Sequence, residues 1–252
     1  MVYINFLILL NQNKNLGSFL SKNTFIQKKM PFIFTQMNLS NSLENYKTLL
    51  KRNKNIFYVS EHVFLRNTYN NIISKQTTNV IYKKHILDSL SLAPFFRSFW
   101  YTKKERTCLD FGTGGGFPGL VLSVFFPQIF ISLLDSIEKK NTFHIGILNI
   151  IKSDNCNSIC FRGEKLGHSI NHQKKYDLVL SRAVADLNLL IYLSITLLNT
   201  KGKFTAMKKI NGCGKEINGT MVFFSKPNIK LKCLVKIDNE KMGKVLVVVK
   251  KL

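Results

Sequence analysis

Acidic residues are scarce in this sequence: only 14 Asp and Glu stand against 37 Lys and Arg, which gives a formal net charge of +23 over 252 residues. Such an excess is larger than solubility requires and indicates a polyanionic partner, with nucleic acid as the leading class. A coding bias toward A and T explains part of the lysine content, because Asn, Ile and Phe are also abundant. It does not explain why acids are so few.

Cysteines number only five, an odd count without the spacing of a disulfide framework. This indicates a reducing compartment. Cys156 and Cys160 precede His168 and His172, but the segment 161–167 between the two pairs is too short for a zinc finger of that type. The sequence therefore predicts no metal site.

Long apolar runs are also missing. Residues 1–10 are apolar, yet they are far shorter than a membrane span and lack the charged start and the cleavage site of a signal peptide. We therefore expect a cytoplasmic protein that does not associate with membranes. Residues 1–40 have no clear periodicity and are expected to be a disordered extension or the product of an upstream start, with Met37 as an alternative first residue.

Glycine, in contrast, is concentrated in one stretch near the middle of the chain. Residues 108–119 read CLDFGTGGGFPG, so that a short apolar run delivers Asp110 and then breaks into glycines. Glycine permits positive φ angles and close approach of a ligand to the backbone. The stretch therefore predicts a ligand-binding loop between a strand and a helix that begins in the apolar run 120–126.

Two kinds of ligand suit such a loop. Gly114, Gly116 and Gly119 satisfy the dinucleotide pattern G-x-G-x-x-G, although a lone match is a weak signal. Asp110 favours S-adenosylmethionine instead, because a carboxylate at the strand end can accept from an ammonium group and gives pyrophosphate nothing. Pro118 has no N–H to offer a phosphate. We therefore predict S-adenosylmethionine, with a dinucleotide-binding oxidoreductase as the alternative.

Strand and helix patterns alternate after this loop, which is typical of a doubly wound, mainly parallel α/β sheet. Apolar residues at helical spacing in 43–65 and 80–96 predict a small helical region ahead of the sheet. The expected organisation is an extension over 1–40, a helical region over 41–105 and a main domain over 106–252. Beyond the loop we predict helices at 139–151 and 187–198, and strands at 130–134, 157–161, 176–180, 203–207, 230–237 and 244–250, the last two forming an antiparallel edge.

Candidate ligand-binding residues follow successive strands of this sheet, whose carboxyl ends form the usual ligand crevice. Asp135 suits the ribose hydroxyls of an adenosine, and Gly163 and Glu164 are placed to frame the adenine. Arg182 lies nearest the expected reaction centre. Structural alternatives exist, because Asp135 can cap the following helix and Glu164 can pair with Arg162 on the surface.

Arg182 raises an electrostatic difficulty, because a guanidinium beside a sulfonium is repulsive unless an anion lies between them. The methionine carboxylate of the cofactor, an RNA phosphate or Asp110 can each supply that anion. The sequence does not choose among them.

Six motifs follow one another along the chain, at residues 66–74 (RNTYNNIIS), 85–89 (HILDS), 110–119 (DFGTGGGFPG), 134–136 (LDS), 162–164 (RGE) and 181–183 (SRA). In this order they resemble the small-subunit ribosomal RNA methyltransferase G family, also called glucose-inhibited division protein B. The resemblance implies a Rossmann-like class I methyltransferase sheet with helices on both faces. It also implies a monomeric enzyme that uses S-adenosylmethionine to methylate N7 of a guanine in 16S rRNA, or in a precursor of the small ribosomal subunit.

Carried over position by position, the resemblance places cofactor contacts at Gly112, Phe117, Gly163, Glu164 and Arg182. Together with the residues of the loop and the strand ends, the candidate cofactor-binding set is Asp110, Gly112, Gly114, Phe117, Asp135, Gly163, Glu164 and Arg182. Arg182 is also the candidate catalytic residue.

The chemistry of guanine N7 agrees with what the sequence lacks. N7 has a lone pair and no proton, so its attack on a sulfonium methyl requires alignment and no general base. His85 and Asp88, one helical turn apart, therefore need not be a catalytic pair, and a helix-surface contact is the commoner arrangement. Methylation of an amine would call for an Asp/Asn-Pro-Pro-aromatic turn after the fourth strand, and methylation of C5 for a cysteine. Residues 181–186 (SRAVAD) offer neither.

Departures from the family pattern keep a second hypothesis open. Arg66 stands where the family has tryptophan, and the sequence after Lys209 matches only weakly. With the net charge of +23, these departures also suit an RNA-binding protein that keeps a methyltransferase scaffold without activity.

Overall fold

The computed structural model describes residues 53–70, 85–93, 95–96, 106–209, 216, 219–220, 229–237 and 244–251. The expected extension over 1–40 lies outside the described residues, as do the first part of the helix predicted over 43–65 and residues 71–74 of the first motif.

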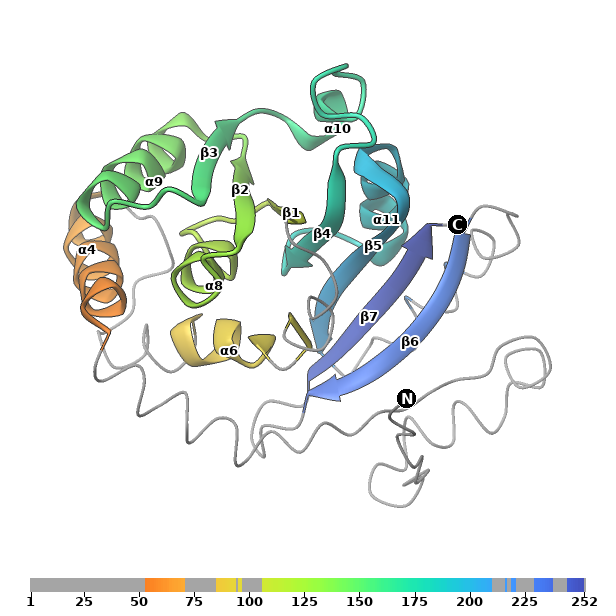
Figure 1. The fold of residues 1–252 in the computed structure, drawn as a ribbon, viewed down its shortest axis with the longest axis horizontal. Coiled ribbons are helices and arrows are strands. Elements are labelled where there is room, and N and C mark those ends of the chain that lie inside the picture. Colours follow the sequence, from red (N-terminus) through yellow and green to blue (C-terminus); the bar gives the residue numbers. More distant parts are fainter. Residues whose placement is uncertain are drawn as a thin grey trace.

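A seven-stranded sheet forms the centre of the described part of the chain, in the order β3-β2-β1-β4-β5-β7-β6 (Figure 1). Strands β1 to β5 are parallel, and β7 is antiparallel to both β5 and β6. The predicted mainly parallel sheet with an antiparallel edge is therefore confirmed. The strands are β1 (Arg106–Phe111), β2 (Ile129–Asp135), β3 (Cys156–Cys160), β4 (Tyr176–Arg182), β5 (Leu198–Lys209), β6 (Ile229–Ile237) and β7 (Lys244–Lys251).

The central strands are buried on both faces, which explains why they read as short apolar runs. The last four residues of β1 are all buried, and so are the last five of β2. The strand order reverses between β1 and β4, which lie side by side. The carboxyl ends of these two strands therefore flank the crevice in which such sheets bind ligands.

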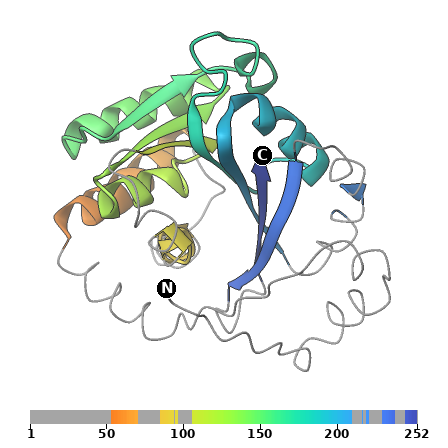
Figure 2. The ribbon, with the colours of Figure 1, turned by 45° about the vertical axis from the view of Figure 1, so that its right-hand side comes forward.

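Helices cover both faces of the sheet, as predicted (Figure 2). Side chains of α4 (Lys54–Asn70), α6 (Leu87–Leu90), α8 (Gly119–Phe125) and α9 (Glu138–Ile150) share one buried apolar cluster with one face. Side chains of α10 (Gly163–Leu166) and α11 (Leu187–Leu197) join a second cluster on the other face. No helix in the described ranges is long and apolar enough to cross a bilayer.

The helical region packs directly onto the sheet. Val59 of α4 and Leu90 of α6 are fully buried in the same cluster as Ile131 of β2. Asn53 begins α4, because its side-chain oxygen accepts hydrogen bonds from two backbone N–H groups of the first turn. The helix then continues past Leu65, where the predicted helix ended. The site described below is therefore formed by the sheet on one side and bordered by the helical region on another.

Candidate functional site

A pocket of about 640 Å³ lies at the carboxyl ends of the parallel strands. Its wall combines the glycine loop, the segments that follow β2, β3 and β4, and His85 from the helical region. All the predicted site residues except Asp110 line this single pocket, namely Gly112, Gly114, Phe117, Asp135, Gly163, Glu164 and Arg182.

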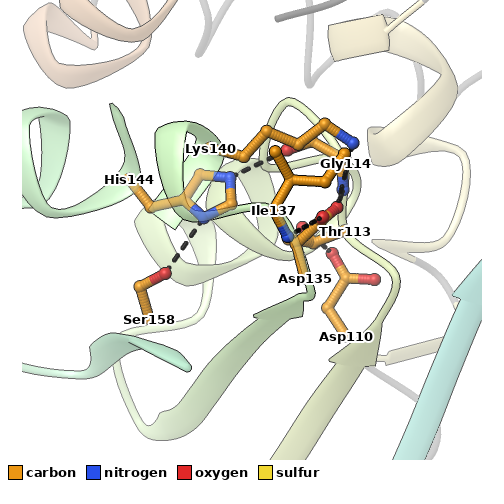
Figure 3. A network of polar contacts seen from close by, with 8 residues as sticks. All are labelled: Asp110, Thr113, Gly114, Asp135, Ile137, Lys140, His144 and Ser158. Carbon is orange, nitrogen blue, oxygen red and sulfur yellow. Dashed lines mark hydrogen bonds and ion pairs between the residues drawn. The ribbon is translucent and has the colours of Figure 1, made fainter. Parts of the chain in front are cut away.

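Asp110 is fully buried and is not among the lining residues. Its Oδ2 accepts a hydrogen bond from the Thr113 hydroxyl at 2.6 Å (Figure 3). The same oxygen accepts from the Gly119 N–H at 2.7 Å. Burial raises the pKa of Asp110 to about 6, although these two hydrogen bonds and nearby Arg182 oppose the rise. The sequence suggested that this carboxylate accepts from a ligand ammonium group. In the structure, Oδ2 ties the glycine loop to the start of α8, and the contact with a ligand stays a prediction.

Gly114 is held from two sides. Its N–H donates to Asp135 Oδ2 at 3.0 Å, and its carbonyl accepts from His144 Nε2 at 2.9 Å (Figure 3). Its φ angle is +62°, and a Cβ added there would meet no heavy atom within 4 Å. The peptide is therefore fixed, while the space where a side chain would project stays open to a ligand.

Asp135 ends β2 and is 8% exposed. Its Oδ1 accepts from the Ile137 N–H at 3.0 Å, at the start of α9, and its Oδ2 also accepts from Lys140 Nζ at 3.2 Å. Support for the following helix, the structural alternative for Asp135, is thus part of its role. A carboxylate offers about four acceptor sites, and the Gly114 bond is the third one used, so one acceptor site is left for a ligand hydroxyl.

His144 was not predicted from the sequence, yet it supports the loop from behind. Its ring is fully buried and lies between Gly114 and Ser158, whose Oγ is 3.0 Å from Nδ1 (Figure 3). A carbonyl oxygen can only accept, so Nε2 carries the proton, and Nδ1 accepts from the Ser158 hydroxyl. Burial lowers the pKa of His144 to about 4, so the ring is neutral at pH 7.

Arg182 is the last residue of β4 and is held by the helical region. Its Nη1 lies 3.0 Å from Asp88 Oδ2, and its Nη2 lies 2.7 Å from His85 Nδ1. A guanidinium can only donate, so His85 Nδ1 is an unprotonated acceptor. Asp88 is 1% exposed, so the interpretation of His85 and Asp88 as a contact on the helix surface is wrong. Asp88 was not among the three anions considered for Arg182, but it is the one that Arg182 contacts.

Two glycines allow neighbouring segments to close around the pocket. A Cβ at Gly112, where φ is +72°, would lie 2.6 Å from Val184 Cγ2, and a Cβ at Gly163 would lie 2.1 Å from Phe111 Cζ. Glu164 is exposed at the pocket edge, and none of the ion pairs of the described residues joins it to Arg162. The His85 ring stacks on Phe117 at a centroid distance of 4.9 Å and adds a flat wall.

The arrangement suits an elongated ligand with hydroxyl groups at one end and a hydrogen-bond acceptor at the other. Asp135 offers an acceptor at that end, Gly114 leaves room in the middle, and the remaining N–H donors of Arg182 serve the other end. S-adenosylmethionine has this shape and these groups. In the described ranges no three His, Cys, Asp or Glu side chains gather so as to hold a metal ion.

The family model and the related sequences that match this chain carry the same family name. The family model described as rRNA small subunit methyltransferase G matches residues 51–231. A protein of the same name from Alkaliphilus metalliredigens is 37% identical over 125 residues, 50% of this chain and 51% of that protein. One from Lysinibacillus sphaericus is 33% identical over 152 residues, 60% of this chain and 62% of that protein. The chain thus spans less than two thirds of either relative.

Comparison with solved structures supports the same fold. A SAM dependent methyltransferase from Aquifex aeolicus superposes with a TM-score of 0.50 at 14% identity, over 71% of this chain and 100% of that one. At this identity the likeness concerns the fold alone. The predicted Rossmann-like methyltransferase fold is confirmed.

Proposed function

The chain belongs to the rRNA small subunit methyltransferase G family, and we propose that it transfers a methyl group from S-adenosylmethionine to N7 of a guanine in 16S rRNA. The observation that carries the proposal is the single pocket in which the glycine loop and three strand ends converge. Gly114 leaves that pocket open where any other residue would place a side chain.

The proposed cofactor contacts follow the length of the pocket. Asp135 accepts from one ribose hydroxyl, and Gly163 and Glu164 border the adenine. Gly112, Gly114 and Phe117 line the middle, and Arg182 lies at the reacting end. Bound S-adenosylmethionine supplies an electrophilic methyl group on its sulfonium.

The chain's own contribution is alignment. Guanine N7 carries a lone pair and no proton, so no side chain has to remove a proton from the base. Arg182 is fixed by Asp88 and His85, so its free donors keep one orientation toward whatever enters the pocket. The stacked His85 and Phe117 rings limit the movement of ligands on that side. Positioning of this kind supplies much of the acceleration in reactions between two bound partners.

The proposed partner is 16S rRNA or a precursor of the small ribosomal subunit, and the net charge of +23 supports a polyanion of this kind. The proposal takes the protein to act as a monomer. Such a substrate places the protein in the cytoplasm. Affinity for the RNA is expected to fall steeply with salt, because each neutralised phosphate releases counterions.

Two measurements test the proposal. Calorimetry should detect binding of S-adenosylhomocysteine and none of NAD; the reverse result would favour the oxidoreductase alternative. Small ribosomal subunits from a strain that lacks the modification should then accept labelled methyl groups. Cofactor binding without any transfer to rRNA would favour the RNA-binding alternative.

A further inference from the structure

Two regions that are distant in sequence meet at Arg182. Asp88 comes from α6 of the helical region and Arg182 from the end of β4, and their Oδ2 and Nη1 atoms are 3.0 Å apart. The side chains are 2% and 15% exposed, so water screens the pair only weakly. Arg182 lines the pocket, whereas Asp88 lies behind it.

An unpaired arginine here would conflict with the ligand that the proposed function requires. S-adenosylmethionine carries a positive sulfonium, and two cations in a partly buried pocket repel each other over several ångströms. Asp88 cancels the charge of Arg182 without occupying space in the pocket. His85 binds the second Nη as a neutral acceptor, so it fixes the guanidinium and adds no charge.

We propose that Asp88 is the counter-ion that allows Arg182 and a cationic cofactor to share the pocket. This inference rests on the proposed function and adds a role for a residue that does not line the pocket. Asp88 is therefore a positioning residue that acts through Arg182. It also gives the helical region a part in selecting the charge of the ligand.

Two other carboxylates near Arg182 have partners of their own. Asp135 pairs with Lys140, and Asp110 Oδ2 is bound by Thr113 and Gly119. Asp110 also lies within electrostatic range of Arg182, so its charge has to be held constant in any test. A pH of about 7.5 lies above the pKa of Asp110, which is about 6, and keeps this carboxylate ionised.

A comparison of S-adenosylmethionine with S-adenosylhomocysteine isolates the effect of ligand charge. The two compounds have similar shapes, and only the first carries the sulfonium. Dissociation constants of both are measured at pH 7.5 and low salt for the wild type and for Asp88→Asn. We expect Asp88→Asn to lower the affinity for S-adenosylmethionine by roughly tenfold more than the affinity for S-adenosylhomocysteine, since the arginine charge is then uncompensated. Arg182→Gln should shift the ratio of the two dissociation constants in the opposite direction. The double variant should return this ratio toward the wild-type value.

Glu216→Gln provides a matched control. Glu216 pairs with Lys208 at 2.7 Å and lies outside the pocket lining, so the same change of charge should leave the ratio unchanged. Circular dichroism identifies the folded variants. If Asp88→Asn does not fold, the opposite shift in Arg182→Gln decides the matter.

The possible outcomes distinguish a failure of the counter-ion role from a failure of the proposed function. A ratio that stays within about twofold of the wild type in every folded variant would overturn the counter-ion role and leave the proposed function standing. A wild type that binds neither compound would overturn both. A fall in both affinities by the same factor would assign Asp88 a purely structural role and contradict the inference.

Discussion

At the Asp135 end of the pocket the contacts are local in sequence, whereas at the Arg182 end they are not. Asp135 binds the backbone N–H groups of Gly114 and Ile137, which are 21 and 2 residues away. Arg182 binds His85, which is 97 residues away. One end is therefore built by a continuous strand–loop–helix stretch. The other depends on the helical region docking onto the sheet, so the two ends should respond differently to substitution.

The largest effect is expected in the local part, at Gly119. A Cβ there would lie 2.5 Å from Leu133 Cδ2 and 2.7 Å from Asp110 Oδ2. Gly119→Ala should lower the free energy of unfolding by about 4 kcal/mol, from overpacking and a disturbed hydrogen bond to a buried carboxylate. Denaturant unfolding measures this change.

Gly114→Ala is the matched control for Gly119→Ala. Its Cβ would meet open space, so only the positive φ angle costs stability, about 1 kcal/mol. Binding of S-adenosylhomocysteine should nevertheless weaken strongly, because the methyl group enters the pocket. Equal losses of stability in the two variants would contradict the geometry of the loop.

Asp110 should give this end a pH dependence of its own. Its folded pKa of about 6 lies above the ordinary aspartate value of 3.8, so the folded state holds the proton more tightly. Stability is then favoured at low pH and is lost as pH rises from about 4 to about 6, by about 3 kcal/mol for this one group. Unfolding of the wild type and Asp110→Asn across this range measures it, and parallel curves would refute the assignment.

His144 should show how far the loop depends on support from behind. His144→Ala leaves the Gly114 carbonyl without this donor and should cost about 2 kcal/mol of unfolding free energy. Ser158→Ala removes only the hydroxyl on Nδ1 and should cost about 1 kcal/mol. Neither should change the relative affinities for S-adenosylmethionine and S-adenosylhomocysteine, and a change in that ratio would link the two ends of the pocket.

The smallest effect on binding is expected at the distant-contact end, for Arg182→Lys. Lysine keeps the charge near Asp88 but cannot bind Asp88 and His85 with one planar group. Affinity for S-adenosylhomocysteine should fall by about 1 kcal/mol, and the single-turnover rate by about tenfold. Unchanged affinity with a collapsed rate would assign the arginine to the RNA instead.

The same contrast explains what could be predicted of the fold. Strands β1, β2 and β4 were recognisable because buried parallel strands are apolar runs that end at polar residues. β5 was predicted only over 203–207, but it spans Leu198–Lys209. Its outer residues include Lys208 and Lys209, which pair with Val245 and Lys244 of β7 although their side chains are polar. Hydrogen bonding between strands does not depend on side-chain polarity, so the sequence pattern underestimates this strand.

For the site, position was predictable and partnership was not. Asp135 and Arg182 follow strands, and the topology of the sheet brings strand ends together. The pairing of Arg182 with Asp88 required knowledge of how α6 docks. His144 was missed because an isolated polar residue in a helix looks the same in sequence whether it faces water or the interior.

Identification of the methylated nucleoside tests the central claim most directly. Small subunits that lack the modification are incubated with the protein and S-adenosylmethionine labelled in its methyl group, and the digested rRNA is separated by chromatography and mass. The account predicts label in 7-methylguanosine alone, and far less of it with Arg182→Ala. Label in a methylated amine or in C5 of a pyrimidine, or full activity in Arg182→Ala, would contradict it.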